Sequence, residues 1–263
     1  MSTPPTSYRR FVALGDSQTE GLNDLDEAGV PRGWADNLAL RLASTTSPGL
    51  TYANLAVRRV RAAHVREVQL PAALALEPDL ATVAVGMNDV LRHDFDLAAV
   101  LADIEHTVAT LRATGCTVAM MTFPDIGAMI PMLRRLRRRE EALNDGVRVI
   151  AARYDAPLLD IYPLVICGDP TMWSHDRIHG SADGHRRIGE AMAELLGVPG
   201  VDPDWSLPAR PTPAGVRALT RDLWWAGSFV SPWLVGQFRR TRTKAEAARA
   251  KRPELLPAIG EAG

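Results

Sequence analysis

The stretch "FVALGDSQTEG", residues 11–21, joins an apolar run directly to a Gly-Asp-Ser turn near the start of the chain. A continuous apolar run of this length is typical of a strand that is covered on both faces of a parallel sheet. The small residues that follow either form a plain turn or hold Ser17 at the end of the strand for chemistry. The rest of the sequence decides between these two interpretations.

Four more apolar runs of the same kind follow, at residues 52–56, 80–85, 117–123 and 157–161. Helical patterns separate them; Trp34, Leu38 and Leu42 recur every four residues, and a last helix is expected from about Ser181 to Leu196. This alternation predicts an α/β fold with a doubly wound, five-stranded parallel sheet. In such sheets ligands bind at the carboxyl ends of the strands, so functional residues should follow the apolar runs.

The composition is that of an ordinary soluble protein, with 263 residues, 46% hydrophobic and 23% charged. A net charge of -1 gives no overall basic field, and we expect no nucleic-acid partner. Cys116 and Cys167 have neither the number nor the spacing of a disulfide framework or a metal site. The N-terminal "MSTPPTSYRR" lacks the apolar stretch of a signal peptide, so we expect a cytoplasmic location.

The chain divides into a disordered N-terminus at 1–8, a globular domain at 9–198, and a Pro-rich strap with a Trp-rich extension at 199–263. Residues 223–238 of this extension, "LWWAGSFVSPWLVGQF", are apolar and precede a basic run. They are too few for a comfortable membrane span. Three arrangements fit: packing against the domain, a homodimer interface, or peripheral contact with a membrane.

Polar residues of catalytic type follow three of the apolar runs. Ser17 follows the first, Asn88 in "GMND" follows the third, and Asp176 and His179 lie in a loop after the fifth. A serine hydroxyl needs an adjacent base to act as a nucleophile, and an imidazole base needs a carboxylate to orient it. The Asn88 amide and the Ser17 main-chain N–H are donors of the kind that stabilise an oxyanion.

These blocks, "GDSQTEG", "NLAVR", "GMND" and "DRIHGSADGH", resemble in order and spacing the four sequence blocks of the SGNH (GDSL-type) hydrolases. The resemblance covers roughly residues 9–197. It implies a flavodoxin-like three-layer α/β/α sandwich and a serine esterase that hydrolyses (thio)esters of small acyl groups, lipids or acetylated sugars, with no cofactor or metal. It also implies that Ser17 is the nucleophile, His179 the general base, Asp176 its orienting partner and Asn88 an oxyanion donor.

Two positions depart from the family pattern. Arg59 stands where a glycine usually supplies a third oxyanion N–H; the N–H survives, but arginine is strained if the turn needs a positive φ. The bulky cation would also alter substrate choice. Gly180 stands where a proline is common, and we expect it to loosen the loop that holds His179.

Several alternatives stay open. The scaffold could serve an acyltransferase, or an inactive binding module in which Arg59 blocks the pocket. Asp16 is expected to brace the Ser17 turn, and His185 to point into a helical surface as a structural residue. The arginine-rich run at 134–139 is either a solvated helix face or a basic rim that attracts anionic substrates.

Overall fold

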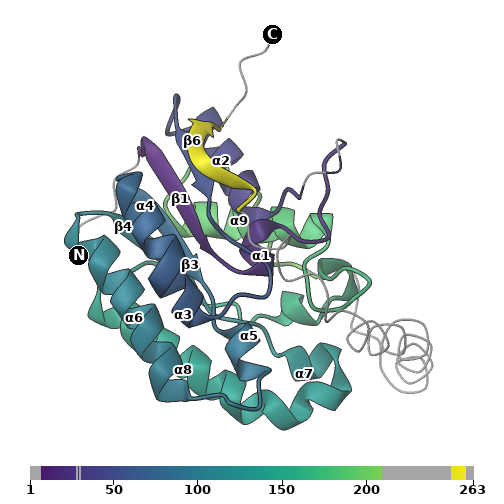
Figure 1. The fold of residues 1–263 in the computed structure, drawn as a ribbon. Helices are drawn as coiled ribbons and strands as arrows, with labels where there is room; N and C mark the ends of the chain where they lie inside the picture. The colour runs from purple at the N-terminus through teal and green to yellow at the C-terminus, as the bar shows by residue number, and fades with distance from the viewer. Residues whose placement is uncertain (1–6, 28, 30, 209–249, 259–263) are drawn as a thin grey trace.

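A computed structural model describes residues 7–27, 29, 31–208 and 250–258 (Figure 1). The Trp-rich segment 223–238, for which three arrangements were expected, lies outside the described residues. Within the described ranges, no helix combines the length and the apolar character needed to cross a membrane.

Over the described residues, one sheet of six strands organises the fold, in the order β5-β4-β3-β1-β2-β6. The strands are β1 (Arg10–Gly15), β2 (Thr51–Asn54), β3 (Leu80–Ala84), β4 (Thr117–Met121), β5 (Leu158–Leu159) and β6 (Arg252–Pro257). Strands β1 to β5 pair in parallel, which confirms the predicted five-stranded core and its α/β/α class. The chain passes from β1 to β2 on one side and then returns to β3 on the other. The carboxyl ends of β1 and β3 therefore form the topological switch point.

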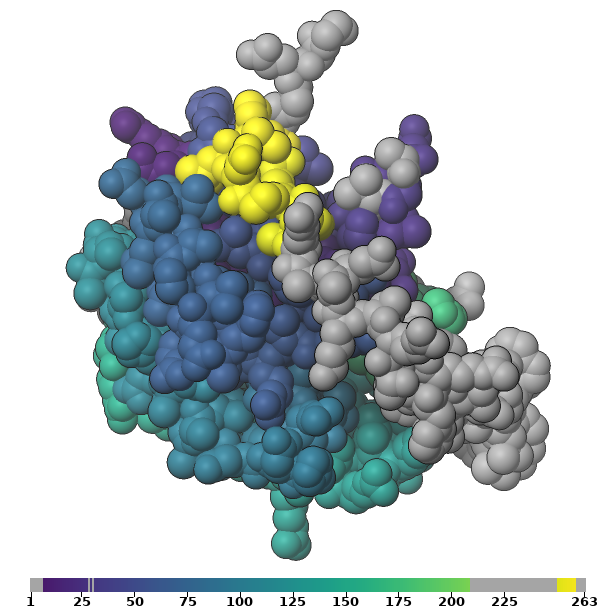
Figure 2. All heavy atoms as spheres, in the orientation of Figure 1, coloured from purple at the N-terminus to yellow at the C-terminus, as the bar shows by residue number. Residues whose placement is uncertain are grey.

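The sixth strand, β6, was not predicted and makes the sheet mixed. It pairs antiparallel with β2, with Tyr52 opposite Leu256. Pro253 and Pro257 obscure the strand pattern, because proline cannot donate to the ladder and is tolerated in sheets mainly at edges. Figure 2 shows β6 on the molecular surface, where it covers the outer edge of β2.

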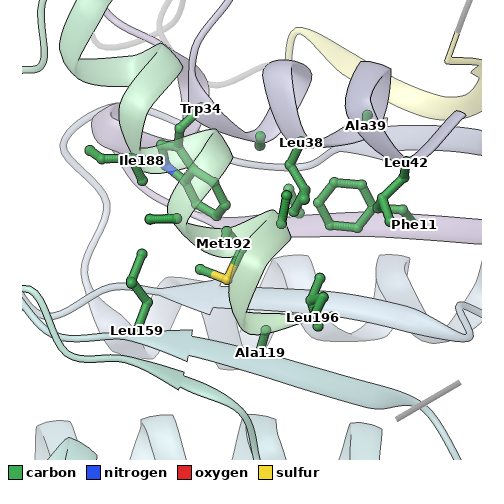
Figure 3. Close-up of a cluster of buried hydrophobic side chains, with 14 of the residues drawn as sticks. Phe11, Trp34, Leu38, Ala39, Leu42, Ala119, Leu159, Ile188, Met192 and Leu196 are labelled. Carbon is green, nitrogen blue, oxygen red and sulfur yellow. The ribbon is translucent and has the colours of Figure 1, made fainter. Parts of the chain in front are cut away.

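Helices α2 (Trp34–Ser44) and α9 (Ala182–Leu195) cover one face of the sheet. Their apolar side chains pack with Phe11 of β1 in one buried cluster, which Figure 3 shows in close-up. Gly189 allows the two helices to approach closely, because a Cβ there would lie 2.8 Å from Asn37 Cβ. The expected N-cap of α9 is present, since Ser181 Oγ accepts a hydrogen bond of 3.1 Å from the Gly184 N–H.

The opposite face carries a second buried cluster. Its helices are α3 (Ala62–His64), the π-helical turn η1 (Val65–Gln69), α4 (Leu70–Ala75), α6 (Leu97–Ala113) and α8 (Arg137–Arg153). A 3-10 helix, η2 (Pro131–Leu136), leads directly into α8. Short turns complete the described fold: α1 (Ser17–Glu20), α5 (Met87–Val90), α7 (Ile126–Met129), η3 (Val165–Gly168) and η4 (Pro170–Met172).

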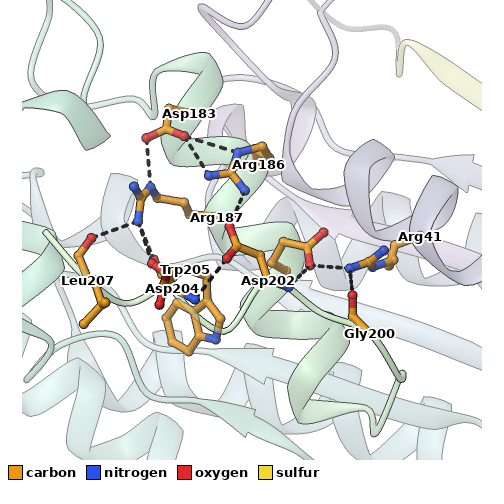
Figure 4. A network of polar contacts seen from close by, with 10 residues as sticks. Arg41, Asp183, Arg186, Arg187, Gly200, Asp202, Asp204, Trp205 and Leu207 are labelled. Carbon is orange, nitrogen blue, oxygen red and sulfur yellow. Dashed lines mark hydrogen bonds and ion pairs between the residues drawn. The ribbon is translucent and has the colours of Figure 1, made fainter. Parts of the chain in front are cut away.

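The ends of the globular domain are also packed. Tyr8, the last residue of the expected N-terminal tail, is buried, and its N–H donates to Ser47 Oγ at 2.8 Å. At the other end, Arg187 on α9 donates to three carbonyls of the strap, those of Asp204, Trp205 and Leu207 (Figure 4). The first residues of the Pro-rich strap are therefore held against α9.

Candidate active site

Ser17 begins helix α1 directly after β1, at the carboxyl edge of the sheet. The preceding Gly15 approaches the neighbouring strand so closely that a Cβ would lie 2.5 Å from the Ala84 carbonyl oxygen. Asp16 caps the short helix, since its carboxylate accepts from the Gln18 N–H at 3.2 Å. The tight turn thus fixes the serine at the switch point of the sheet.

The structure brings together Ser17, His179 and Asp176. His179 Nε2 lies 2.8 Å from Ser17 Oγ, and His179 Nδ1 lies 2.7 Å from Asp176 Oδ2. The His179 and Asp176 side chains are only 14% and 10% exposed. A hydroxyl, an imidazole and a carboxylate are thus hydrogen-bonded in series, in a partly dry environment that strengthens such contacts.

Asp176 is held as a carboxylate. Its Oδ1 accepts from Ser174 Oγ and from the main-chain N–H groups of Ile178 and His179 at 2.8–2.9 Å. Burial by itself would raise the pKa of Asp176, but the hydrogen bonds and charge of His179 and these N–H donors outweigh burial and hold its pKa well below its usual range. A fixed negative charge therefore faces His179 Nδ1.

Two amide side chains that the sequence reasoning missed also contact this loop. Asn23 Nδ2 donates to Asp176 Oδ2 at 2.7 Å, and Gln18 Nε2 donates to the Ile178 carbonyl at 2.6 Å. The sequence gives no signal for them, because polar residues after a turn are ordinarily solvated. Gly180 bridges to Trp173, which closes the loop that we expected to be loosened.

Asn88 follows β3 in the turn that begins α5. Its amide nitrogen donates to Asp16 Oδ2 at 3.1 Å and to the Val60 carbonyl at 3.0 Å, so both amide hydrogens bond to protein groups in this structure. Asp16 is buried, and burial raises its pKa to about 6. Asp16 thus braces the Ser17 turn, as expected, and also joins it to Asn88.

Arg59 adopts a φ of 69°, the left-handed conformation that glycine tolerates best. The turn thus needs a positive φ at position 59, and Arg59 is strained there, as we expected from the sequence for that case. The carbonyl of the next residue, Val60, accepts a hydrogen bond from the Asn88 side chain. This turn therefore lies beside the "GMND" block that carries Asn88. The adjacent Arg58 is held by Glu20 through contacts of 2.5–3.1 Å, whereas the Arg59 side chain is exposed.

His185, which the sequence led us to expect as a structural residue, is fully buried. Its Nδ1 accepts from the Trp34 N–H at 3.3 Å, and burial lowers its pKa to about 4. It is on the inner face of α9, where a neutral imidazole packs against α2. Position 185 follows the helical period of Ile188 and Met192, a pattern that could have revealed its burial.

The arginines of the run at 134–139 do not share one role. Arg137 pairs with Asp125, Arg139 donates to the Arg92 carbonyl at 2.8 Å, and Arg134 donates to the Gly127 carbonyl at 3.2 Å. Arg135 and Arg138 are exposed. Three of the five arginines thus tie local main chain and side chains together.

A family model described as the GDSL-like lipase/acylhydrolase family matches residues 13–187. The chain belongs to this family. The match spans the Ser17, Asn88 and Asp176/His179 blocks, and it establishes this GDSL-like hydrolase as an SGNH-type ester hydrolase. A comparison with curated proteins finds no match.

Solved structures share the fold of this GDSL-like hydrolase. TesA is 25% identical with a TM-score of 0.58, and covers 72% of this chain and 98% of its own. LAE5, an α/β hydrolase from the metagenome of Lake Arreo, is 22% identical with a TM-score of 0.61 over 72% and 95% of the two chains. Axe2, an acetylxylan esterase from Geobacillus stearothermophilus, is 17% identical with a TM-score of 0.61 over 74% and 97%.

Proposed function

We propose that the protein hydrolyses carboxylic esters or thioesters of small acyl groups or lipids through an acyl-enzyme on Ser17. The observation that carries this proposal is the hydrogen-bonded series Ser17 Oγ–His179 Nε2 at 2.8 Å and His179 Nδ1–Asp176 Oδ2 at 2.7 Å. The order of groups is that of a nucleophile, a general base and the carboxylate that orients the base.

In the proposed first half-reaction, Ser17 Oγ attacks the ester carbonyl carbon and its proton passes to His179 Nε2. The tetrahedral intermediate collapses as the bond to the leaving alcohol or thiol breaks, and His179 returns the proton to that leaving group. Water then attacks the acyl-enzyme with the same proton transfers, which releases the acid and restores Ser17. Asp176, whose pKa is held low, stabilises the imidazolium at each stage.

The oxyanion is proposed to accept hydrogen bonds from the main-chain N–H of Ser17, the Asn88 amide and the main-chain N–H of Arg59. Asn88 bonds to Asp16 and Val60 in this structure, so its donation to an oxyanion requires exchange of one of these bonds. The removal of one such donor typically costs about 10²–10³ in kcat.

Apolar side chains beside the site support an acyl group of apolar character. Ile178, next to His179, packs with Ile126, Met129 and Ile130 in a small cluster that also includes Met87, next to Asn88. We propose that an acyl chain on Ser17 extends toward this cluster. Such contacts favour hydrocarbon over charged acyl groups.

A fluorophosphonate probe tests the proposal. We expect stoichiometric labelling of the wild type on Ser17, located by mass spectrometry, and loss of labelling in Ser17→Ala. Ser44→Ala, which removes an exposed serine on α2, should be labelled like the wild type. A folded wild type that resists the probe would exclude an activated serine. Alcohol acceptors added during ester turnover then separate hydrolysis from acyl transfer.

A further inference from the structure

Two amide side chains that follow Ser17 in the chain reach the loop that carries Asp176 and His179. Gln18 lies next to Ser17 in α1, and Asn23 lies in the turn after this helix. The partners of both residues are about 150 or more positions away in the chain. Both contacts therefore join the Ser17 turn to the loop of the other two residues.

Gln18 holds the main chain on both sides of His179. Its Nε2 donates to the Ile178 carbonyl at 2.6 Å, and its Oε1 accepts from the Gly180 N–H at 3.3 Å. The main chain immediately before and after the imidazole is thus tied to the residue that follows Ser17. This arrangement fixes the separation of Ser17 Oγ and His179 Nε2 at the level of the backbone.

Asn23 contacts the same carboxylate oxygen as His179. Its Nδ2 donates to Asp176 Oδ2 at 2.7 Å and to Ser174 Oγ at 3.0 Å, while Ser174 Oγ donates to Asp176 Oδ1 at 2.8 Å. Asn23 has a φ of 71°, a left-handed conformation that asparagine adopts more readily than most residues. The turn thereby aims the amide at the carboxylate.

We propose that Gln18 and Asn23 are positioning residues for ester hydrolysis, Gln18 by fixing the main chain around His179 and Asn23 by sharing Asp176 Oδ2 with His179. This proposal rests on the proposed function of Ser17. It assigns the two amides distinct effects, because the Gln18 side chain bonds to the main-chain groups of Ile178 and Gly180, whereas the Asn23 side chain bonds to the charged partner of the base.

Gln18→Met keeps the length of the side chain and removes both hydrogen bonds. We expect kcat for a p-nitrophenyl ester to fall by about 10-fold to 100-fold with KM little changed, because the misplacement affects the reacting groups rather than substrate binding. The acid limb of the pH–rate profile should stay in place, since no charged group near His179 changes.

Asn23 is tested with Asn23→Gly, which keeps the left-handed turn without the amide, and with the isosteric Asn23→Asp. Among the described residues, the charged or titratable groups that interact with His179 include Asp176 on its own loop, Asp16 after β1 and His185 on α9. A second carboxylate at position 23 would favour the imidazolium further. We expect kcat to fall in both variants and the acid limb to move upward by roughly one pH unit in Asn23→Asp.

Asp155→Gly is the matched control, because Asp155 is exposed, has a φ of 48° and lies after α8, away from the site. It should reproduce the wild-type kcat and pH profile. Unfolding curves of all variants show whether lost activity reflects lost folding. A purely structural role for the amides would lower stability without moving the acid limb in Asn23→Asp.

The ¹H NMR resonance of the His179 Nδ1 proton gives a readout that needs no turnover. We expect it to move downfield in Asn23→Gly, where Asp176 Oδ2 loses a competing donor, and to broaden in Gln18→Met, where the loop loses two tethers. Wild-type kcat and an unchanged resonance in these variants would overturn the inference. A wild type without esterase activity or probe labelling would instead overturn the proposed function, while the resonance still decides the roles of the amides.

Discussion

Arg59 has a backbone angle that a residue with a Cβ adopts only at a cost in free energy. The turn after β2 requires a φ of 69° at this position, and a left-handed residue with a Cβ costs roughly 1–2 kcal/mol. The exposed arginine remains there although glycine would relieve the strain. The strain therefore follows from the geometry of the turn and not from packing of the side chain.

We predict that Arg59→Gly raises the free energy of unfolding by roughly 0.5–1 kcal/mol, the relief of strain less the entropy of an added glycine. Urea unfolding measures the change. Arg61→Gly is the matched control, because Arg61 has a φ of -108° and should lose stability on the same substitution. Equal destabilisation by both substitutions would contradict a strained Arg59.

At the scale of elements, one buried carboxyl joins helix α8 to the short helix α7. Glu140 on α8 is fully buried, and its Oε1 accepts from the Ile126 N–H at 3.2 Å. Burial raises the pKa of Glu140 to about 8, and Oε2 has no hydrogen-bond partner among the described residues. The carboxyl is thus held in its neutral form at pH 7, next to the apolar cluster beside the candidate site.

This burial predicts a pH-dependent stability. The folded-state pKa of about 8 exceeds the ordinary value of 4.5, so the folded state binds more protons between these limits. Neutral Glu140 makes its whole contribution to the free energy of unfolding below about pH 4.5. This contribution falls by about 1.4 kcal/mol per pH unit as the pH rises towards 8. Glu140→Gln keeps the acceptor and should remove this slope from unfolding curves measured between these pH values.

The exposed neighbour on α8 supplies the control for this prediction. Glu141→Gln should leave the slope of stability against pH as it is in the wild type. Parallel wild-type and Glu140→Gln curves would show that Glu140 ionises normally in the folded protein.

At the scale of the whole molecule, the last described segment returns to the first half of the chain. Strand β6 pairs with β2, and Lys251 just before it is largely buried. Lys251 Nζ donates to Asp36 Oδ2 at 2.6 Å and to the carbonyls of Pro31 and Arg32 at 2.7 and 2.9 Å. One ammonium therefore joins the edge strand, helix α2 and the loop before α2.

We predict that Lys251→Met lowers the free energy of unfolding by roughly 2–4 kcal/mol, because it leaves the partly buried Asp36 carboxylate without its cation. The double variant Lys251→Met/Asp36→Asn should recover part of this loss, since the uncompensated charge is gone. Urea unfolding of the two variants makes the comparison. An additive loss in the double variant would show that the pair is not coupled.

Most of the fold, and the main side chains of the candidate site, could be predicted from local sequence. Continuous apolar runs identified β1 to β5, because strands covered on both faces exclude polar residues. The positions of Ser17, Asn88, Asp176 and His179 after these strands predicted that they would meet, and the structure places Ser17, Asp176 and His179 in hydrogen-bonded series. Their chemical roles stay a prediction until the serine is labelled.

Other features were decided only by the tertiary structure. Strand β6 exists because the outer edge of β2 accepts it, and its prolines hide it in the sequence. The burial of His185 depends on how closely α2 packs on α9, and the contacts of Gln18 and Asn23 depend on a loop about 150 residues away. Local sequence determines which residues can form a strand or supply a nucleophile. Long-range packing determines which polar groups meet, because a hydrogen bond between distant segments leaves no periodic pattern in the chain.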